Sequence, residues 1–159
     1  MNKVLIAIDG SENSLRAAEF VGKHMASLEG LQITLLHVLA YVPAPLWDDG
    51  HILSGEEKEA RSRVIEKWLD NQRSLFEPAM REAAARLSSL GVPAARIEVK
   101  TISDSTDAAD SIIEEAKNGF YRIVVLGRCG HAKVRHFPVG SVASRVINRG
   151  AGLHLCLVD

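Results

Sequence analysis

Five short apolar segments recur along the chain, each bounded by residues that favour turns. Four of them are apolar nearly throughout and rich in β-branched residues, which is typical of parallel strands buried on both faces. The segment at residues 97–102 instead alternates apolar and polar side chains, as a half-exposed edge strand does. The five predicted strands comprise residues 4–8, 33–39, 97–102, 123–126 and 153–158.

Amphipathic stretches separate these strands. Ser11 can cap a first helix, in which apolar residues recur at intervals of three and four and so share one face. These residues are Leu15, Ala18, Val21, Met25 and Leu28. The capping-box spacing of Ser54 and Glu57 begins a long helix that runs to Leu90, and we expect Pro78 to kink or split it.

Two shorter helices are predicted in the second half of the chain. Thr106 or Asp107 opens a helix that residues 118–119 close, and residues 141–148 form the last helix. Residues 41–55 contain two prolines, an Asp-Asp-Gly sequence and Trp47, so they are predicted as a surface loop. We expect the features that distinguish this chain from similar proteins to lie between Pro43 and Pro78.

The order of elements predicts an α/β fold. Strands joined by helical crossovers form a parallel sheet with helices on both faces. We expect one domain over residues 1–159, with a doubly wound, flavodoxin- or Rossmann-like sheet of strand order 3-2-1-4-5. In such sheets a ligand lies beyond the carboxyl ends of the strands, where neighbouring connections diverge. Here that position lies between the first and fourth strands.

Composition and charge exclude several classes of partner. The 159 residues carry a formal net charge of -1, so no broad electrostatic field attracts nucleic acid or a membrane surface. No segment approaches the roughly 18 apolar residues of a membrane span, and the first apolar stretch is too brief for a signal peptide. We therefore expect a cytoplasmic protein. Cys129 and Cys156 lack zinc-like spacing and are expected to be reduced thiols.

The loops after the first and fourth strands carry the candidate chemistry. Asp9-Gly10-Ser11 follows the first strand, Gly127 and Gly130 follow the fourth, and Gly140-Ser141 opens the last helix. Glycines allow positive φ and close approach to an anion, and helix-start amides are unpaired donors. A triphosphate could be held there, with positive charge from Lys133, Arg135 and Arg145. The same residues are also ordinary turn and cap residues, so this spacing alone leaves both interpretations open.

Three segments together resemble one family over essentially the whole chain. They are AIDGSENS at residues 7–14, LLHV at 35–38 and VVLGRCGHAKVRHFPVGSVASRVI at 124–147. The chain is similar to the UspA-like, ATP-binding subgroup of the universal stress protein family. The ATP-binding signature of that family is the spacing of Gly127, Gly130 and Gly140-Ser141. The resemblance implies that ATP binds, with Mg²⁺ or Mn²⁺ held by its phosphates. It also implies a homodimer formed through the C-terminal strands.

The resemblance further implies a role for individual residues. Gly127, Gly130, Gly140 and Ser141 would hold the phosphates and ribose, with Val142 following at the helix start and Arg128 within the loop. Asp9 would face the adenosine, and main-chain groups of Val38 would contact the adenine. His131 is interpreted as a phosphate contact or as a residue without a role. The chain departs from the family at Cys129, where a small or hydroxyl residue often stands, and at residues 150–154, which lack a proline-containing run.

No catalytic or metal-binding group is predicted. His131, His136 and Cys129 do not have the spacing of a zinc site. His37 is interpreted as a satisfied histidine of the core or strand end. No nucleophile with a base and an orienting group is recognisable. The leading hypothesis is therefore a non-enzymatic or weakly ATP-hydrolysing regulatory dimer of the stress response, with an unknown protein partner. The alternatives are an adenylating enzyme of the same fold and a nucleotide-free interaction module.

Overall fold

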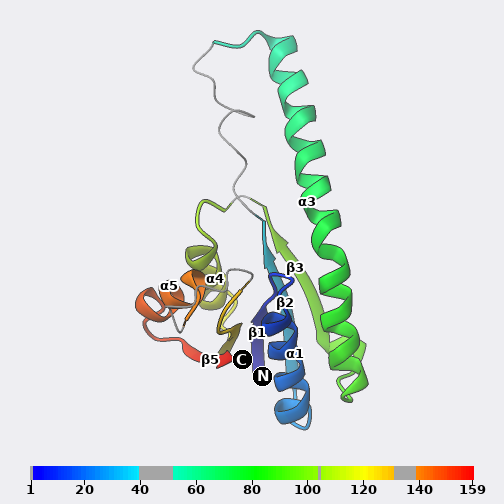
Figure 1. The fold of residues 1–159 in the computed structure, drawn as a ribbon, viewed down its shortest axis with the longest axis vertical. Coiled ribbons are helices and arrows are strands. Elements are labelled where there is room, and N and C mark those ends of the chain that lie inside the picture. The colour runs from blue at the N-terminus through cyan, green and yellow to red at the C-terminus, as the bar shows by residue number, and fades with distance from the viewer. Residues whose placement is uncertain (1, 40–51, 104, 131–138) are drawn as a thin grey trace.

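A computed structural model describes residues 2–39, 52–103, 105–130 and 139–159 (Figure 1). Strands and helices alternate along the chain. The strands are β1 (Asn2–Ala7), β2 (Leu31–Val38), β3 (Ile97–Ile102), β4 (Ile123–Gly127) and β5 (His154–Val158). The helices are α1 (Glu12–Met25), α3 (Gly55–Ser89), α4 (Ala108–Asn118) and α5 (Ser141–Arg149), with a 3-10 turn, η1 (Ala94–Arg96), before β3.

The five strands form one parallel sheet in the order β3-β2-β1-β4-β5. This confirms the predicted α/β fold and strand order. β1 and β2 begin two residues earlier than the apolar pattern indicates, because Asn2 pairs with Leu31 and Lys3 with Gln32. β1 therefore occupies the centre of the sheet, between β2 and β4, and its carboxyl end lies at the crossover point where ligands bind in such folds.

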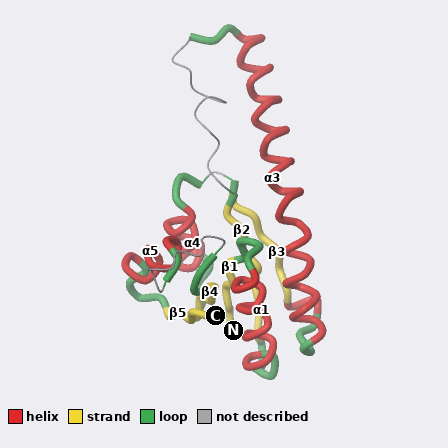
Figure 2. The backbone as a smooth tube through the Cα atoms, viewed as in Figure 1, coloured by secondary structure: helices red, strands yellow, loops and turns green. Residues whose placement is uncertain are grey.

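Helices cover both faces of the sheet (Figure 2). Alternate residues of β1 enter two separate clusters: Val4 and Ile6 pack with the residues of α1 and α3, and Leu5 packs with those of α4 and α5. All three side chains are at most 2% exposed. Burial on both faces explains why the strand is continuously apolar. No described helix is both long enough and apolar enough to cross a bilayer.

Side chains cap three of the helices. Ser11 accepts a hydrogen bond from the Ser14 amide at the start of α1, and Asp107 accepts from the Ala109 and Asp110 amides at the start of α4. Ser54 and Glu57 form the predicted capping box at the start of α3. Each cap satisfies amides that the helix itself leaves without a partner.

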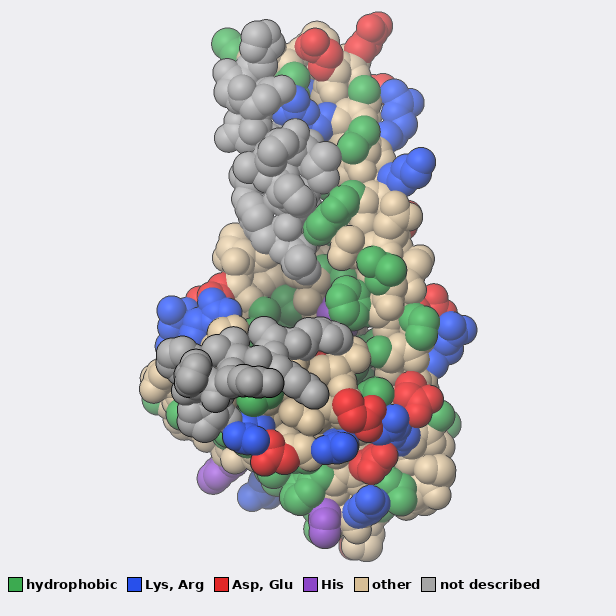
Figure 3. All heavy atoms as spheres, in the orientation of Figure 1, with side chains coloured by type: hydrophobic (Ala, Val, Ile, Leu, Met, Phe, Trp, Pro, Cys, Tyr) green, Lys and Arg blue, Asp and Glu red, His purple; other side chains and the backbone are tan. Residues whose placement is uncertain are grey.

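Helix α3 is continuous for 35 residues with Pro78 inside it, so of the two expected effects, a kink or a split, the split does not occur. Proline removes one main-chain hydrogen bond, but downstream of it Met80, Ala83 and Leu87 are buried against the sheet, and this packing holds the helix together. The N-terminal part of α3 extends beyond the sheet (Figure 1). Hydrophobic side chains continue along the helix (Figure 3), and its exposed ones include Val64 and Leu75.

Candidate functional site

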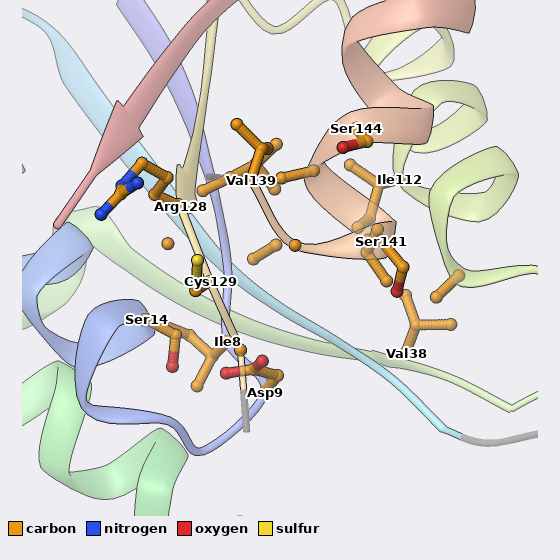
Figure 4. Close-up of a pocket in the computed structure, with 18 of the residues that line it drawn as sticks. Ile8, Asp9, Ser14, Val38, Ile112, Arg128, Cys129, Val139, Ser141 and Ser144 are labelled. Atoms are coloured by element: carbon orange, nitrogen blue, oxygen red, sulfur yellow. The ribbon is translucent and has the colours of Figure 1, made fainter. Parts of the chain in front are cut away.

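A cavity of about 570 Å³ lies beyond the carboxyl ends of β1, β2 and β4. Figure 4 shows side chains from strands, helices and the loops that follow the strands around this space, among them Asp9, Val38, Cys129 and Ser141. The lining consists of Ala7, Ile8, Asp9, Ser14, Leu36, His37, Val38, Ala108, Ile112, Leu126, Gly127, Arg128, Cys129, Gly130, Val139, Gly140, Ser141, Val142, Ala143 and Ser144. Eight of the nine predicted site residues are in this lining, and the ninth, His131, lies outside the described residues.

The segment after β4 is held against α5 and β5 by main-chain hydrogen bonds. The Gly140 amide donates to the Arg128 carbonyl at 2.7 Å, and the Arg128 amide donates to the Val158 carbonyl at 2.7 Å. The Asn13 side-chain amide of α1 donates to the Cys129 carbonyl at 3.1 Å. These bonds connect the two glycine segments and fix both at the mouth of the sheet.

The three signature glycines are required for close packing, not for positive φ as predicted. A Cβ on Gly127 would lie 2.9 Å from the Asn13 carbonyl carbon and the Ser14 nitrogen, and one on Gly130 would lie 2.5 Å from an Asp9 carboxylate oxygen. A Cβ on Gly140 would lie 3.3 Å from the Arg128 oxygen. The described glycines with positive φ are Gly10, Gly30, Gly91 and Gly152. The absence of a Cβ thus brings main chain close to main chain at Gly127 and Gly140, and brings Gly130 close to the Asp9 carboxylate.

Helix α5 begins differently from the other helices. Its N-cap is Gly140, and among the described residues no side chain caps it. Residues of its first turn, Ser141, Val142 and Ala143, line the cavity. Helix-start amides that no side chain caps are donors with the positive end of the helix dipole behind them. This end of the cavity can therefore bind an anion.

Asp9 organises the side of the cavity next to Gly130. One oxygen of its carboxylate accepts hydrogen bonds from the Ser11 amide at 2.9 Å and the Ser11 hydroxyl at 2.5 Å. Gly10, between them, has a φ of 81°, which a residue with a side chain rarely adopts. The turn after β1 is therefore closed by its own aspartate, which fixes the position of the carboxylate beside the cavity.

Comparison with known protein families identifies the family of this chain. Residues 1–151 match the model of the universal stress protein family. This chain belongs to that family. Among curated relatives, universal stress protein YxiE of Bacillus subtilis is 25% identical over 158 residues, which cover 91% of this chain and 90% of YxiE.

Solved universal stress proteins share the fold. UspA from Lactobacillus plantarum superposes with a TM-score of 0.69 at 18% identity, covering 99% of this chain and 97% of that one. A universal stress protein from Archaeoglobus fulgidus in complex with dAMP superposes with a TM-score of 0.58 at 21% identity, covering 100% and 98%. The parallel sheet and its helical layers are thus those of the universal stress proteins.

Two arginines of this universal stress protein are already paired. Arg145, predicted to supply charge to the glycine loop, donates to the Asp107 carboxylate at 2.5 Å and does not appear in the described lining. Arg128 lines the cavity, but its guanidinium donates to Asp159. The predicted cations Lys133 and Arg135 lie outside the described residues. Of the three predicted cations, Arg145 is therefore the one the structure describes, and its guanidinium is bound to Asp107.

Sequence reasoning missed several lining residues because they belong to distant elements. Ile112 was recognised only as part of the apolar face of α4, and Ser14 only as the last residue of the AIDGSENS segment, yet both line the cavity. Val139 also lines it, immediately before the helix start. The side chains of Ile112 and Val139 give the cavity apolar lining, and Ser14 adds a hydroxyl. No local signal distinguishes an apolar helix residue that faces a cavity from one that faces the core.

His37 was expected to be satisfied, and one of its ring nitrogens is not. Its Nδ1 lies 2.6 Å from the Ile8 carbonyl oxygen, but in the part of the chain that the structure describes its buried Nε2 has no hydrogen-bond partner. The residue is 4% exposed, and its ring stacks on Phe76 with centroids 3.8 Å apart. Burial lowers the pKa of His37, while the Ile8 carbonyl opposes that shift. The ring is therefore neutral at pH 7.

The lowered pKa predicts a pH dependence of stability. The unfolded chain takes up a proton at His37 near pH 6.5, before the folded protein does, so the free energy of unfolding falls as the pH drops below about 6.5. Urea unfolding at pH 7.0 and 5.5 measures this fall. We expect a smaller fall in His37→Gln, which stays neutral, whereas His24→Gln, at an exposed position near the end of α1, should show the same fall as the parent. An equal pH slope in the two variants would contradict the prediction.

Proposed function

We propose that this universal stress protein binds ATP in the cavity at the carboxyl end of its sheet. The observation that carries the proposal is the start of α5, where helix amides without a side-chain cap adjoin a main-chain loop closed by Gly127, Gly130 and Gly140. Such an arrangement favours phosphate groups. The cavity of about 570 Å³ also lies within the range of small-molecule sites. The dAMP complex of the Archaeoglobus fulgidus relative supports an adenine nucleotide.

The two ends of the cavity suggest the orientation of the nucleotide. In this proposal the phosphates lie on Gly127, Arg128, Gly130 and the first turn of α5, at Gly140, Ser141 and Val142. The adenosine lies toward Asp9 and the end of β2 at Val38, where Ile112 and Val139 provide apolar contact. An apolar wall suits the faces of a base, and a fixed carboxylate suits its amino or hydroxyl groups.

The charges around the cavity bear on how a metal ion would bind. Within the described lining, Asp9 supplies the carboxylate side chain. One of its oxygens accepts two hydrogen bonds from Ser11. A divalent ion such as Mg²⁺ usually keeps several waters and takes substrate phosphates as ligands. The residues therefore fit a Mg²⁺ or Mn²⁺ ion held mainly by the phosphates of ATP.

We propose a regulatory rather than a metabolic role. Bound ATP favours one conformation of the protein, which a partner protein recognises, and any hydrolysis is slow. The protein acts as a homodimer through β5, which lies at the edge of the described sheet and pairs there with β4. An apolar edge strand is an aggregation risk unless something covers it, which favours pairing with a second copy. Action in the stress response and a cytoplasmic location stay predictions.

Nucleotide extraction tests the proposal directly. Protein purified without added nucleotide is boiled, and the supernatant is analysed by mass spectrometry. Calorimetric titration of the stripped protein with ATP follows. We expect ATP or its hydrolysis product ADP in the supernatant and saturable binding at one site per chain. A supernatant without adenine nucleotide, together with no heat of binding up to millimolar ATP, would rule out the proposed function.

A further inference from the structure

His37 lies between the candidate cavity and helix α3. It is the second-last residue of β2, lines the cavity, and stacks on Phe76 of α3. We propose that His37 is a positioning residue that couples the placement of α3 to the geometry of the ligand site at the end of β1. For its effect on ligand binding, the inference rests on the proposed function.

The first link joins His37 to β1. A carbonyl oxygen can only accept, so Nδ1 must carry the proton and donate to the Ile8 carbonyl. On the same stretch the Ile8 amide donates to the Leu36 carbonyl at 2.8 Å. The peptide that connects Ile8 to Asp9 is therefore held from β2 by the His37 side chain, and the preceding peptide, between Ala7 and Ile8, is held by the main chain of β2. Any shift of the His37 ring is transmitted to the residue whose carboxylate borders the cavity.

The second link joins His37 to α3. The rings of His37 and Phe76 are stacked, with an interplanar angle of 29°. Phe76 itself is not in the described lining of the cavity, so it can influence a ligand there only through its neighbours. Stacked aromatic pairs have a preferred geometry. If α3 rotates or slides, the His37 ring must therefore move with Phe76, or the stack is lost. The position of α3 thus sets the position of the ring.

The unsatisfied nitrogen argues that stability alone does not account for His37. With Nδ1 protonated, Nε2 is a bare acceptor, and it has no partner in the described part of the chain. A buried polar atom without a partner costs free energy that an apolar side chain of similar size would not. The favourable interactions of this ring are its bond to β1 and its stack on α3. The coupling of these two elements is what the residue provides.

Coupling of this kind is reciprocal. If the position of α3 alters ligand affinity, then a bound ligand alters the position and mobility of α3 by the same free energy. α3 has a part that extends beyond the sheet, so a change at the cavity is carried to a surface far from it (Figure 1).

Substitutions at neighbouring positions of α3 test the inference. Phe76→Ala removes the stack. Leu75→Ala, at the preceding residue, removes a side chain that is 67% exposed and serves as the matched control. Phe76→Tyr keeps the aromatic ring and serves as the conservative rescue. We expect Phe76→Ala to weaken ATP binding at least about fivefold in calorimetry, at the low end of allosteric effects. Leu75→Ala and Phe76→Tyr should bind within twofold of the parent, all at temperatures where circular dichroism shows the proteins folded.

A second measurement needs no ligand. Hydrogen exchange of the ligand-free proteins reports on the Ile8 and Ser11 amides, which donate to Leu36 and Asp9. We expect faster exchange of these amides in Phe76→Ala than in Leu75→Ala. If ATP does not bind the parent but this difference is present, the proposed function fails and the coupling stands. Equal exchange rates in the two variants would overturn the coupling, whatever the affinity for ATP.

Discussion

Gly140→Ala is expected to weaken ATP binding about tenfold or more, equivalent to at least about 1.4 kcal/mol. The added Cβ would lie 3.3 Å from the Arg128 oxygen and the Cys129 Cα, so the start of α5 must move away from the glycine loop. The main-chain angles of Gly140, φ -64° and ψ 159°, are open to alanine. The loss would therefore come from displaced amides rather than from a strained backbone. Calorimetric titration with ATP measures it.

Gly55→Ala is the matched control for this substitution. Gly55 is at the start of α3, and a Cβ there meets no atom within 4 Å. The control should bind ATP as the parent does. Equal affinities for Gly140→Ala and Gly55→Ala would remove the start of α5 from the binding site, even if another part of the cavity held the nucleotide.

Asp9→Ala is expected to weaken ATP binding by about tenfold as well, since hydrogen bonds to charged groups are worth roughly 1.5–3 kcal/mol. Two effects contribute. The substitution removes the carboxylate that borders the cavity, and it leaves the Ser11 amide and hydroxyl without the acceptor that closes the turn. Asp9→Asn should fall between alanine and the parent, because its amide oxygen can still accept from Ser11. Calorimetric titration of each variant with ATP measures the order of their affinities.

A charge-matched control separates these effects from a change in net charge. Asp110→Ala removes an aspartate that pairs with Arg149 on the exposed surface of α4 and α5. This substitution changes the formal charge by the same amount as Asp9→Ala, but Asp110 is not part of the described cavity lining. We expect its ATP affinity to equal that of the parent. If both alanine variants lose affinity to the same extent, the carboxylate of Asp9 has no specific role.

The fold was predictable from the sequence because local patterns determine it. Five apolar runs separated by amphipathic stretches allow few arrangements other than a parallel sheet covered on both faces. The outcome at Pro78 was not predictable in this way. Whether a proline interrupts a helix depends on the packing downstream of it, and the burial of Met80, Ala83 and Leu87 is a tertiary fact.

The candidate site was predictable where main chain and turns define it. Asp9, Gly127 and Gly140 were identified because each lies near the end of a strand or the start of a helix. What was missed depends on contacts between distant segments. The pairing of Arg145 with Asp107 connects two helices, and the stack of His37 on Phe76 connects a strand to a helix far along the chain. Neither contact leaves a periodic or compositional signal.

The pairing of β1 with β4 has a consequence for how the protein matures. Val4 lies beside Ile123, so β1 acquires one of its two neighbours only after β4, in the last third of the chain, has been made. Until then one long edge of β1 and the turn at Asp9 stay open. The nascent chain must therefore rely on α1, β2 and α3 to protect its central strand.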